Sequence, residues 1–331
     1  MKAALLKAPK KIDIGEAARP VLVHGEVMIE PARVGICGSD VSFYLGHRTP
    51  PQYPFLLGHE VVGRVVSVAP GVTKVAAGQR VIVEPNYPCG ACSFCRGGRG
   101  NICPNKLSMG VTTPGCLSEC AAAPAEFVWP LPDSISDVDA ATIEPLTVSL
   151  HALVQSGARI GDTVAVVGCG VVGLLLIHAA VAQGVRVLAH DKIDRKLELA
   201  ARLGAVACGH GDPAALWTAE NVSTVFECAG ATATVEQALS AAPRGSQVVL
   251  LGLSSSPASF VPLRLVREGI RIVPSMIYDH PSDFARSIAL VASGKLRPSC
   301  IVTDTIPFES IGRALEMAST GEAGKIHALM R

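Results

Sequence analysis

The sequence predicts an α/β protein of two domains, one of them built on a parallel, doubly wound sheet. Two observations carry this prediction. Up to about residue 140, short apolar strands alternate with turns rich in Gly, Pro and Asn, whereas from about residue 160 strands alternate with amphipathic helical segments. The length of 331 residues also exceeds what a single hydrophobic core usually accommodates.

The elements can be assigned in chain order. In the N-terminal region the clearest strands are residues 26–34, 61–68 and 80–83, separated by long loops, which suits an antiparallel or barrel-like domain. The following series is strand 163–167, helix 171–183, strand 185–190, helix 195–203, strand 224–228, helix 235–242 and strand 247–251. Repeated βα units predict parallel strands with helices on both faces. The last fifty residues add a helix over 282–293, a strand at 300–302 and a helix over 308–317.

The composition excludes several classes of protein. With 49% hydrophobic and 17% charged residues the chain is not disordered, and the low share of charges favours an oligomer. A net charge of +1 gives no electrostatic footprint for nucleic acid or an anionic membrane. The first twenty residues do not resemble a signal peptide, and no apolar run reaches the roughly 18 residues that a bilayer requires. We expect a soluble, cytoplasmic protein that acts on a small molecule.

Four cysteines form the most specific local motif. They are separated by two, two and seven residues: Cys89, Cys92, Cys95 and Cys103. Zinc favours four tetrahedral thiolates, and the glycine-rich loop allows the backbone to present them. A complete shell leaves no position for substrate, so this zinc would be structural. An iron–sulfur cluster and a pair of disulfides are the alternatives, but the spacing and the absence of an export signal favour zinc.

A second constellation lies upstream. Cys37 stands in the segment GICGSD, and His59 and Glu60 follow in the segment GHE. A thiolate, an imidazole and a carboxylate from separate loops suit zinc and leave a position open for catalysis. Taken singly, Cys37 is more often a small buried hydrophobe and His59 a satisfied core or surface group.

The segment 164–173 predicts a dinucleotide site. It contains Gly168, Gly170 and Gly173 between a strand and an apolar helix that begins with Val171 and Val172, so that a phosphate would rest on the helix N-terminus. Asp191 ends the next strand, where a carboxylate accepts ribose hydroxyls and repels a 2′-phosphate, which favours NAD over NADP.

Other residues qualify or extend this nucleotide site. The alternative for Asp191 is an ordinary polar strand end, and Lys192 and Arg195 are placed to accommodate a phosphate. Cys228 and Gly252 lie at the carboxyl ends of later strands, where such sheets bind ligand.

Together, GICGSD, GHE, the four-cysteine loop and the GxGxxG turn resemble the medium-chain zinc alcohol dehydrogenase family. The resemblance covers essentially the whole chain. It implies a GroES-like β-barrel catalytic domain at residues 1–147 and 280–331 and a Rossmann domain at residues 148–279. It also implies two zinc ions and NAD as cofactors, and a tetramer or dimer.

The segment around Glu144, AATIEPLTVSLHA, is similar to the polyol branch of that family, which includes sorbitol, butanediol and sugar-acid dehydrogenases. The resemblance implies Cys37, His59 and Glu144 as zinc ligands, with Glu60 binding directly or through the zinc-bound water. The alternative for Glu144 is a favourable charge in the first turn of a helix, next to Pro145.

The same resemblance implies a reaction. An alcohol oxygen would take the open zinc position and its carbon would pass a hydride to NAD, with Ser39 as hydroxyl relay and His47 as the exit for the proton. Ser39 is otherwise a turn residue and His47 a solvated side chain. Tyr44, in the loop after the metal cysteine, is a candidate for the substrate pocket or for packing. Asp40 is a structural hydrogen-bonding partner near the site, with a link to the metal histidine as the alternative. We expect a secondary alcohol of a polyol or sugar-derived substrate.

Two alternatives to this function remain. One is a dehydrogenase of a sugar acid of the galactonate or gulonate type, with Arg48, Arg264 and Arg267 as candidate carboxylate partners. The other is a nucleotide-binding relative without turnover, which the full set of metal residues disfavours.

Overall fold

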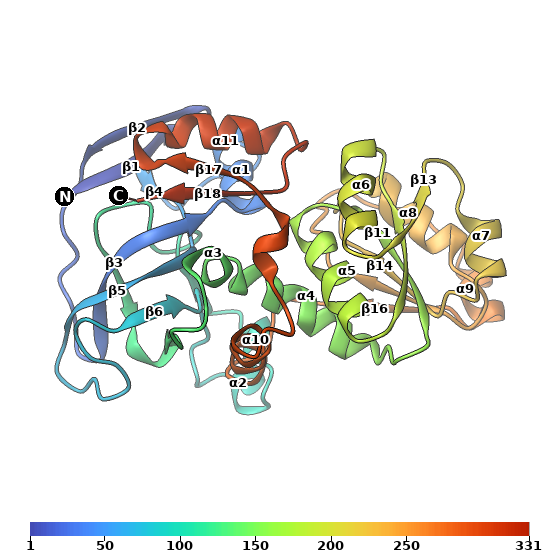
Figure 1. Ribbon diagram of the computed structural model, residues 1–331, viewed down its shortest axis with the longest axis horizontal. Coiled ribbons are helices and arrows are strands. Elements are labelled where there is room, and N and C mark those ends of the chain that lie inside the picture. Colours follow the sequence, from blue (N-terminus) through green and yellow to red (C-terminus); the bar gives the residue numbers. More distant parts are fainter. Residues whose placement is uncertain (331) are drawn as a thin grey trace. The chain divides into compact units, whose positions relative to one another are not determined.

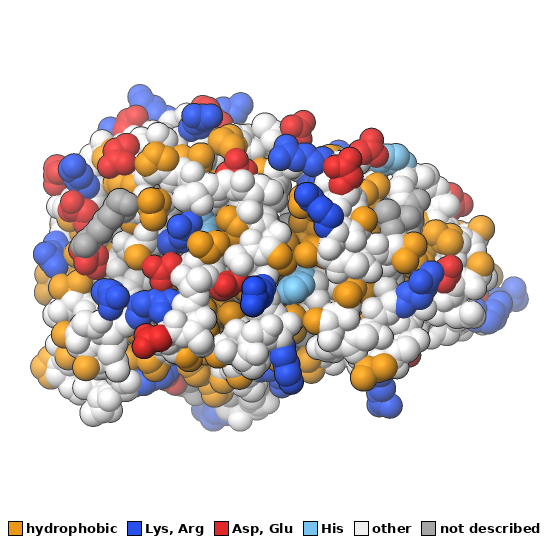
Figure 2. All heavy atoms as spheres, viewed as in Figure 1, with side chains coloured by type: hydrophobic (Ala, Val, Ile, Leu, Met, Phe, Trp, Pro, Cys, Tyr) orange, Lys and Arg blue, Asp and Glu red, His pale blue; other side chains and the backbone are white. Residues whose placement is uncertain are grey.

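The computed structural model describes residues 1–330, except for the side chains of Ala207 and Cys208, and it divides into two compact units (Figure 1). The first unit comprises Met1–Glu144 and Phe284–Arg331, and the second comprises Pro145–Asp283. Among residues 1–330, no helix is long and apolar enough to cross a membrane. On the face drawn in Figure 2, acidic and basic side chains are interspersed.

The first unit is built mainly from antiparallel strands, as the sequence predicts. Its largest sheet has the order β10-β6-β5-β3-β18-β17, with β9 pairing β3 off this path. The strands are β3 (Glu26–Gly35), β5 (Glu60–Val68), β6 (Arg80–Val83), β9 (Ala121–Pro124), β10 (Val128–Pro130), β17 (Val302–Pro307) and β18 (Lys325–Leu329). A smaller sheet joins β2 (Lys11–Glu16), β1 (Lys2–Ala8) and β4 (Phe55–Leu56), and β7 (Asn86–Tyr87) pairs with β8 (Leu107–Ser108).

The C-terminal part of this unit differs from the prediction. Residues 298–301 form a short 3-10 helix, and the strand predicted at 300–302 begins only at residue 302, as β17. The helix predicted over 308–317 is a 3-10 turn at Phe308–Ser310 followed by α11 (Ile311–Ser319). The proline at 298 starts the turn, because it fixes φ and donates no hydrogen bond to a sheet. Helix α11 crosses from β17 to β18, which makes that pair parallel in an otherwise antiparallel sheet.

The second unit contains the predicted parallel sheet. Its order is β13-β12-β11-β14-β15-β16, and every neighbouring pair is parallel. The strands are β11 (Thr163–Val167), β12 (Arg186–His190), β13 (Val206–Gly209), β14 (Thr224–Glu227), β15 (Gln247–Leu250) and β16 (Arg271–Pro274). The order reverses between β11 and β14, so right-handed crossovers place the helices of the two halves on opposite faces.

The helices of the second unit are α4 (Ile143–Ser156), which enters it from the first unit, α5 (Val171–Ala182), α6 (Asp194–Arg202), α7 (Ala214–Ala219), α8 (Thr232–Ala241) and α9 (Pro262–Glu268). Helix α8 begins three residues before its predicted start, since the Thr234 side chain accepts a hydrogen bond from the N–H of the N-cap residue Ala231. The sequence prediction missed α4, α7, α9 and the two edge strands β13 and β16. Most residues of α9 and β16 are at least partly exposed, so these two segments lack an apolar periodicity.

Candidate functional site

Three side chains of the first unit bring metal-binding atoms together. Cys37 directly precedes helix α1 (Gly38–Leu45), His59 directly precedes β5, and Glu60 is its first residue, paired with the end of β3. Their thiol sulfur, ring nitrogen and carboxylate oxygen lie within 4.8 Å of one another. His59 and Glu60 are only 7% and 1% exposed. The structure thus brings together three of the four residues that the resemblance implies as ligands.

Asp40 joins the two loops that carry this cluster. Its Oδ2 accepts a hydrogen bond from the backbone N–H of Cys37 at 2.9 Å, and its Oδ1 accepts one from Gly58 at 3.0 Å. The Oδ1 atom also lies 3.8 Å from Nδ1 of His59, which is beyond hydrogen-bond distance. Because Asp40 is fully buried, it fixes the separation of the two loops, in the structural role that the sequence suggested for it.

A buried lysine holds Glu60 from the side of the sheet. Lys325, the first residue of β18, forms an ion pair with Oε2 of Glu60 and donates a hydrogen bond to the carbonyl of Ile36 at 2.8 Å. A side chain at Gly35 would collide with the carboxylate and would place its Cβ 2.8 Å from Cε of Lys325. Within residues 1–330, the Oε1 atom of Glu60 has no hydrogen-bond partner, so this oxygen is available as a ligand.

Negative groups surround the imidazole. Burial by itself lowers the pKa of His59, but the neighbouring Cys37, Asp40 and Glu144 outweigh it and raise this pKa well above its ordinary value. Glu144, the second residue of α4, is 8% exposed and is not part of the group whose ligand atoms lie within 4.8 Å. Glu144 thus has the helix-terminal position of the alternative reading, and its charge also raises the pKa of His59.

The donor set fits a zinc ion. A thiol, an imidazole and a carboxylate are all zinc ligands, and three protein ligands with an open position are typical of catalytic zinc. Among residues 1–330, Oε1 of Glu60 and Nδ1 of His59 are buried without a hydrogen-bond partner, so both atoms are left to bind a metal ion.

The residues predicted to relay a proton lie in and after α1. Ser39 is half-buried, and its Oγ has no hydrogen-bond partner among the described residues, whereas His47 is exposed. Tyr44, a candidate for the substrate pocket, instead packs in the core and places its hydroxyl 3.4 Å from Oε1 of Glu316. The guanidinium of Arg48 lies over the ring of Phe43 at 4.8 Å.

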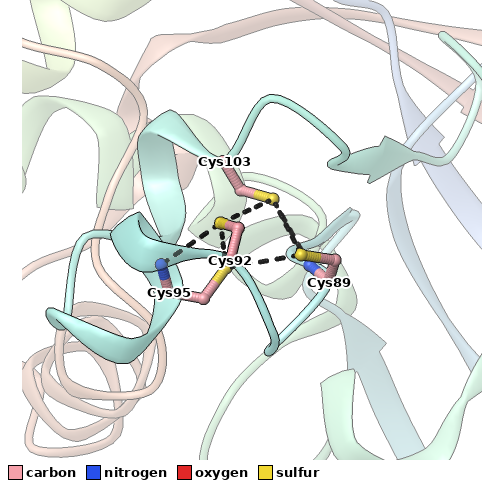
Figure 3. A group of neighbouring side chains, drawn as sticks. All are labelled: Cys89, Cys92, Cys95 and Cys103. Carbon is pink, nitrogen blue, oxygen red and sulfur yellow. Dashed lines mark hydrogen bonds between the residues drawn. The ribbon is translucent and has the colours of Figure 1, made fainter.

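The four cysteines of the loop converge, as Figure 3 shows. The sulfur–sulfur distances are 3.4 Å for Cys92–Cys95, 3.5 Å for Cys103–Cys89, and 3.9 Å for both Cys89–Cys95 and Cys92–Cys103. A tetrahedral zinc with about 2.3 Å bonds separates its sulfurs by about 3.8 Å, whereas a disulfide joins them at about 2.05 Å. All four are free thiols, so their geometry fits one metal ion and not two disulfides.

The glycine turn of the second unit has the geometry that a dinucleotide requires. Gly168 has a φ of 92°, which favours glycine, and a Cβ there would lie 2.7 Å from Ala229. Gly170 faces open space, and a Cβ at Gly173 would collide with the carbonyl of Gly168. Helix α5 begins at Val171 without a side-chain cap, so its first N–H groups are oriented for an anion.

Asp191 follows β12 beside this turn. Its Oδ2 accepts a hydrogen bond from the N–H of Cys169 at 2.7 Å and its Oδ1 accepts one from Ile193 at 3.0 Å. Lys192 and Arg195 are exposed. A carboxylate fixed at the turn is positioned for a ribose. Within residues 1–330, the structure gives no contact between this carboxylate and Lys192 or Arg195.

Further residues lie at the ends of β14 and β15. Cys228 is half-buried, and burial together with the adjacent Glu227 raises the pKa of its thiol. Gly252 is half-buried and approaches Gly230 closely. The sequence reasoning missed Glu227 and also Lys325, because each is a single charged residue in a short apolar strand and carries no motif. The only signal in the sequence is a charged residue at the end of a mostly apolar strand.

Arg264, a candidate partner for a substrate carboxylate, is already engaged. Its guanidinium donates to the carbonyls of Leu239 and Ala242, both at 2.6 Å, and lies 3.2 Å from Glu268. It therefore supports the packing of α9 against the end of α8.

Two family models match the chain. Residues 23–133 match the alcohol dehydrogenase GroES-like domain, and residues 171–293 match the zinc-binding dehydrogenase family. The sorbitol dehydrogenase of Bacillus subtilis (strain 168) is 31% identical over 331 residues, covering 96% of this chain and 93% of that protein.

Solved structures agree over the whole chain. The short chain alcohol dehydrogenase RspB of Escherichia coli CFT073, complexed with NADH, gives a TM-score of 0.93 at 28% identity and covers 100% of this chain and 99% of that chain. A zinc-binding dehydrogenase of Sinorhizobium meliloti 1021, bound to NADP, gives a TM-score of 0.91 at 28% identity and covers 99% of each chain.

Proposed function

The chain belongs to the zinc-binding alcohol dehydrogenase family, and on this premise we propose that it oxidises a secondary alcohol of a polyol or sugar-derived substrate with NAD. The observation that carries the proposal is the convergence of Cys37, His59 and Glu60 within 4.8 Å, in a chain that also holds a complete dinucleotide turn. The reaction converts the alcohol and NAD⁺ into a carbonyl compound, NADH and a proton.

Cys37, His59 and Glu144 would hold the catalytic zinc, with Glu60 as a further ligand through its free Oε1. A zinc ion there supplies Lewis acidity that lowers the pKa of an alcohol oxygen. Asp40 keeps the Cys37 and His59 loops in register, and Lys325 balances one of the negative charges and orients Glu60. Cys89, Cys92, Cys95 and Cys103 would hold the structural zinc.

A proton leaves the substrate during oxidation. Ser39 lies two residues after Cys37, and its Oγ has no hydrogen-bond partner in the part of the chain that the structure describes, so it would accept this proton. His47, which is exposed in the loop after α1, would deliver the proton to water. Both roles are those that the family resemblance implies.

The dinucleotide would bind at the glycine turn of the second unit, with its pyrophosphate on the N-terminus of α5. Similar structures hold NADH in one case and NADP in another. The preference for NAD in this chain rests on Asp191, whose carboxylate would accept the ribose hydroxyls and repel a 2′-phosphate. Arg195, Cys228 and Gly252 would line the remainder of this site.

We assign catalysis to a domain of residues 1–147 and 280–331 and nucleotide binding to residues 148–279. The polyol class is favoured over the sugar acids because Arg264 is bound to backbone carbonyls and to Glu268, which removes one candidate for a substrate carboxylate. Glu144 does not distinguish the two classes, since the branch that its segment resembles includes polyol and sugar-acid dehydrogenases alike.

A homo-oligomer is also part of the proposal. Strand β16 is one edge of its sheet, and the segment that precedes it along the chain exposes large apolar side chains: Leu253, Phe260, Val261, Leu263 and Val266. Unpaired edges and apolar patches of this kind mark association surfaces. Light scattering after size-exclusion chromatography should give a dimer or tetramer, and a Val266→Glu variant should shift it toward monomer. A monomeric wild-type chain would refute this part.

The function is tested by NADH appearance at 340 nm with a panel of polyols, aldonates and simple secondary alcohols. We expect turnover with at least one polyol, faster than with the aldonates. Turnover confined to aldonates would favour the sugar-acid dehydrogenase. If protein that contains zinc and binds NADH turns over no compound of the panel, the proposed enzymatic activity is refuted and a nucleotide-binding protein without turnover is favoured.

A further inference from the structure

Glu227 is a buried carboxylate that the proposed mechanism does not use. It is the last residue of β14 and is 0% exposed. Its Oε1 accepts three hydrogen bonds, from the N–H of Ala229 at 3.0 Å, from the N–H of Gly230 at 2.9 Å, and from the hydroxyl of Thr234 at 2.7 Å. Three donors therefore converge on one oxygen of this carboxylate.

The other oxygen faces a different loop. Oε2 of Glu227 has no hydrogen-bond partner within the part of the chain that the structure describes. A Cβ on Gly252 would lie 2.5 Å from this oxygen, and a Cβ on Gly230 would lie 2.8 Å from the N–H nitrogen of Leu253. The backbone carbonyl of Glu227 also accepts hydrogen bonds from Leu251 and Gly252, both at 2.9 Å. The carboxylate therefore lies between the loops after β14 and β15, with no cation bound to it.

The position in the sheet indicates which half of a dinucleotide this charge faces. The strand order reverses between β11 and β14, and ligands bind outside the carboxyl ends of the strands at this point. Asp191 follows β12 and therefore marks the adenosine half. The ends of β14 and β15 belong to the other half, where the nicotinamide would lie.

The two forms of the cofactor differ in charge at that place. The nicotinamide ring of NAD⁺ is positively charged and that of NADH is neutral, whereas the pyrophosphate is the same in both. A negative charge in a low-dielectric interior attracts the oxidised ring and leaves the reduced ring nearly unaffected. The positive end of α8 offsets only part of a full charge, since a helix terminus carries about half a charge.

We propose that Glu227 is a positioning residue whose buried negative charge favours NAD⁺ over NADH. This inference rests on the proposed nucleotide site. The Oε1 atom of Glu227 also fixes the loop after β14, and this contact should affect the binding of NAD⁺ and of NADH equally. The charge and the loop contacts can therefore be separated by experiment.

The experiment measures the dissociation constants of NAD⁺ and NADH for the full-length protein by fluorescence titration and takes their ratio. Glu227→Gln keeps an acceptor oxygen for the loop and removes the charge, so the ratio Kd(NAD⁺)/Kd(NADH) should rise about fivefold. Thr234→Val removes one donor and keeps the charge, so both constants should rise while their ratio stays within about twofold. Thermal unfolding monitored by circular dichroism verifies that each variant is folded.

Each outcome decides a different claim. An unchanged ratio in Glu227→Gln, or an equally raised ratio in Thr234→Val, would overturn the inference, because the ratio would then not follow the charge. If the Gln variant does not fold, the shorter pair Glu227→Asp and Glu227→Asn decides, since these two variants differ in charge and hardly in size. A ratio about fivefold higher in Glu227→Asn than in Glu227→Asp supports the inference, and equal ratios contradict it. Failure of the wild-type protein to bind either nucleotide would instead refute the proposed function.

Discussion

Lys325 and Glu60 form an ion pair with exposed side-chain fractions of 0% and 1%. Removing two charges from water carries a desolvation penalty, so such a pair is weak evidence for stability and invites a functional explanation. Here the lysine leaves Oε1 of Glu60 free beside Cys37 and His59. The ion pair therefore neutralises the charge at Oε2 of Glu60 and leaves Oε1 available to bind a metal ion.

Replacing Lys325 should be costly. In the metal-free protein, Lys325→Met leaves Glu60 buried without a counter-charge, and we expect the free energy of unfolding to fall by about 3 to 5 kcal/mol. Urea unfolding followed by circular dichroism measures this change. The matched control is Lys7→Met, because Lys7 pairs with Asp13 at the surface, where both side chains are about half exposed, and should cost less than about 1 kcal/mol. If both variants lose less than about 1 kcal/mol of unfolding free energy, the ion pair between Lys325 and Glu60 does not stabilise the fold.

Substitution of Asp191 tests which of the two cofactors, NAD or NADP, the protein prefers. An Ala variant would also release the N–H groups of Cys169 and Ile193, so Asn is the better substitution. Asp191→Asn keeps an acceptor and removes the repulsion of a 2′-phosphate, and the preference for NAD over NADP should fall about tenfold. Dissociation constants of NADH and NADPH measure it, with the exposed Asp194→Asn as control. An unchanged preference would assign the choice to other residues.

Residues with a motif could be predicted from the sequence, and isolated ones could not. The convergence of Cys37 with His59 followed from short segments that resemble a family. Lys325 and Glu227 reach their sites only through strand pairing, β18 with β3 and β14 with β11, which no local pattern encodes. Tyr44 and Arg264 show the converse, because tertiary packing uses side chains that were candidates for substrate.

At the scale of the element, the four-cysteine loop has only short helices of its own, α2 (Ser93–Arg96) and a 3-10 turn at Gly100–Ile102. Backbone N–H groups lower the pKa of Cys89 to about 6, and burial with neighbouring thiols raises that of Cys95 to about 12. A zinc ion would hold all four as thiolates, since metal binding releases the thiol protons.

Loss of one of these thiols should affect stability and leave nucleotide binding intact. Cys95→Ser should lower the zinc content from about two to about one ion per chain and the melting temperature by more than about 5 °C. NADH affinity should stay within about twofold, because the loop and the glycine turn lie in different units. Cys300→Ser, at an exposed thiol outside any metal-capable group of residues 1–330, is the control. Unchanged zinc content in Cys95→Ser would contradict a structural metal here.

Elements with strong periodicity were predicted well and edge elements poorly. Strand β11 and helix α5 match their predicted positions closely, since both are buried and bounded by glycine. Strand β16 and helix α9 are exposed on at least one side, so their sequences contain polar and apolar residues without a clear period. The start of β17 was misplaced because a proline-initiated 3-10 turn precedes it.

At the scale of the whole molecule, the predicted fold class is confirmed: a Rossmann sheet combined with a GroES-like domain. Each unit has its own hydrophobic core. The proposed metal ligands all lie in the first unit and the glycine turn lies in the second. Metal binding and nucleotide binding should therefore be separable by mutation, although turnover requires both.

The most direct test of the two-zinc, NAD-linked account compares wild-type protein with Cys37→Ala by elemental analysis and NADH titration. We predict about two zinc ions per chain in the wild type, about one in the variant, and NADH dissociation constants that agree within about twofold. This result does not depend on knowing the substrate. Equal zinc contents in the two proteins, or loss of NADH binding together with the zinc, would contradict the assignment of Cys37 to a separate catalytic metal.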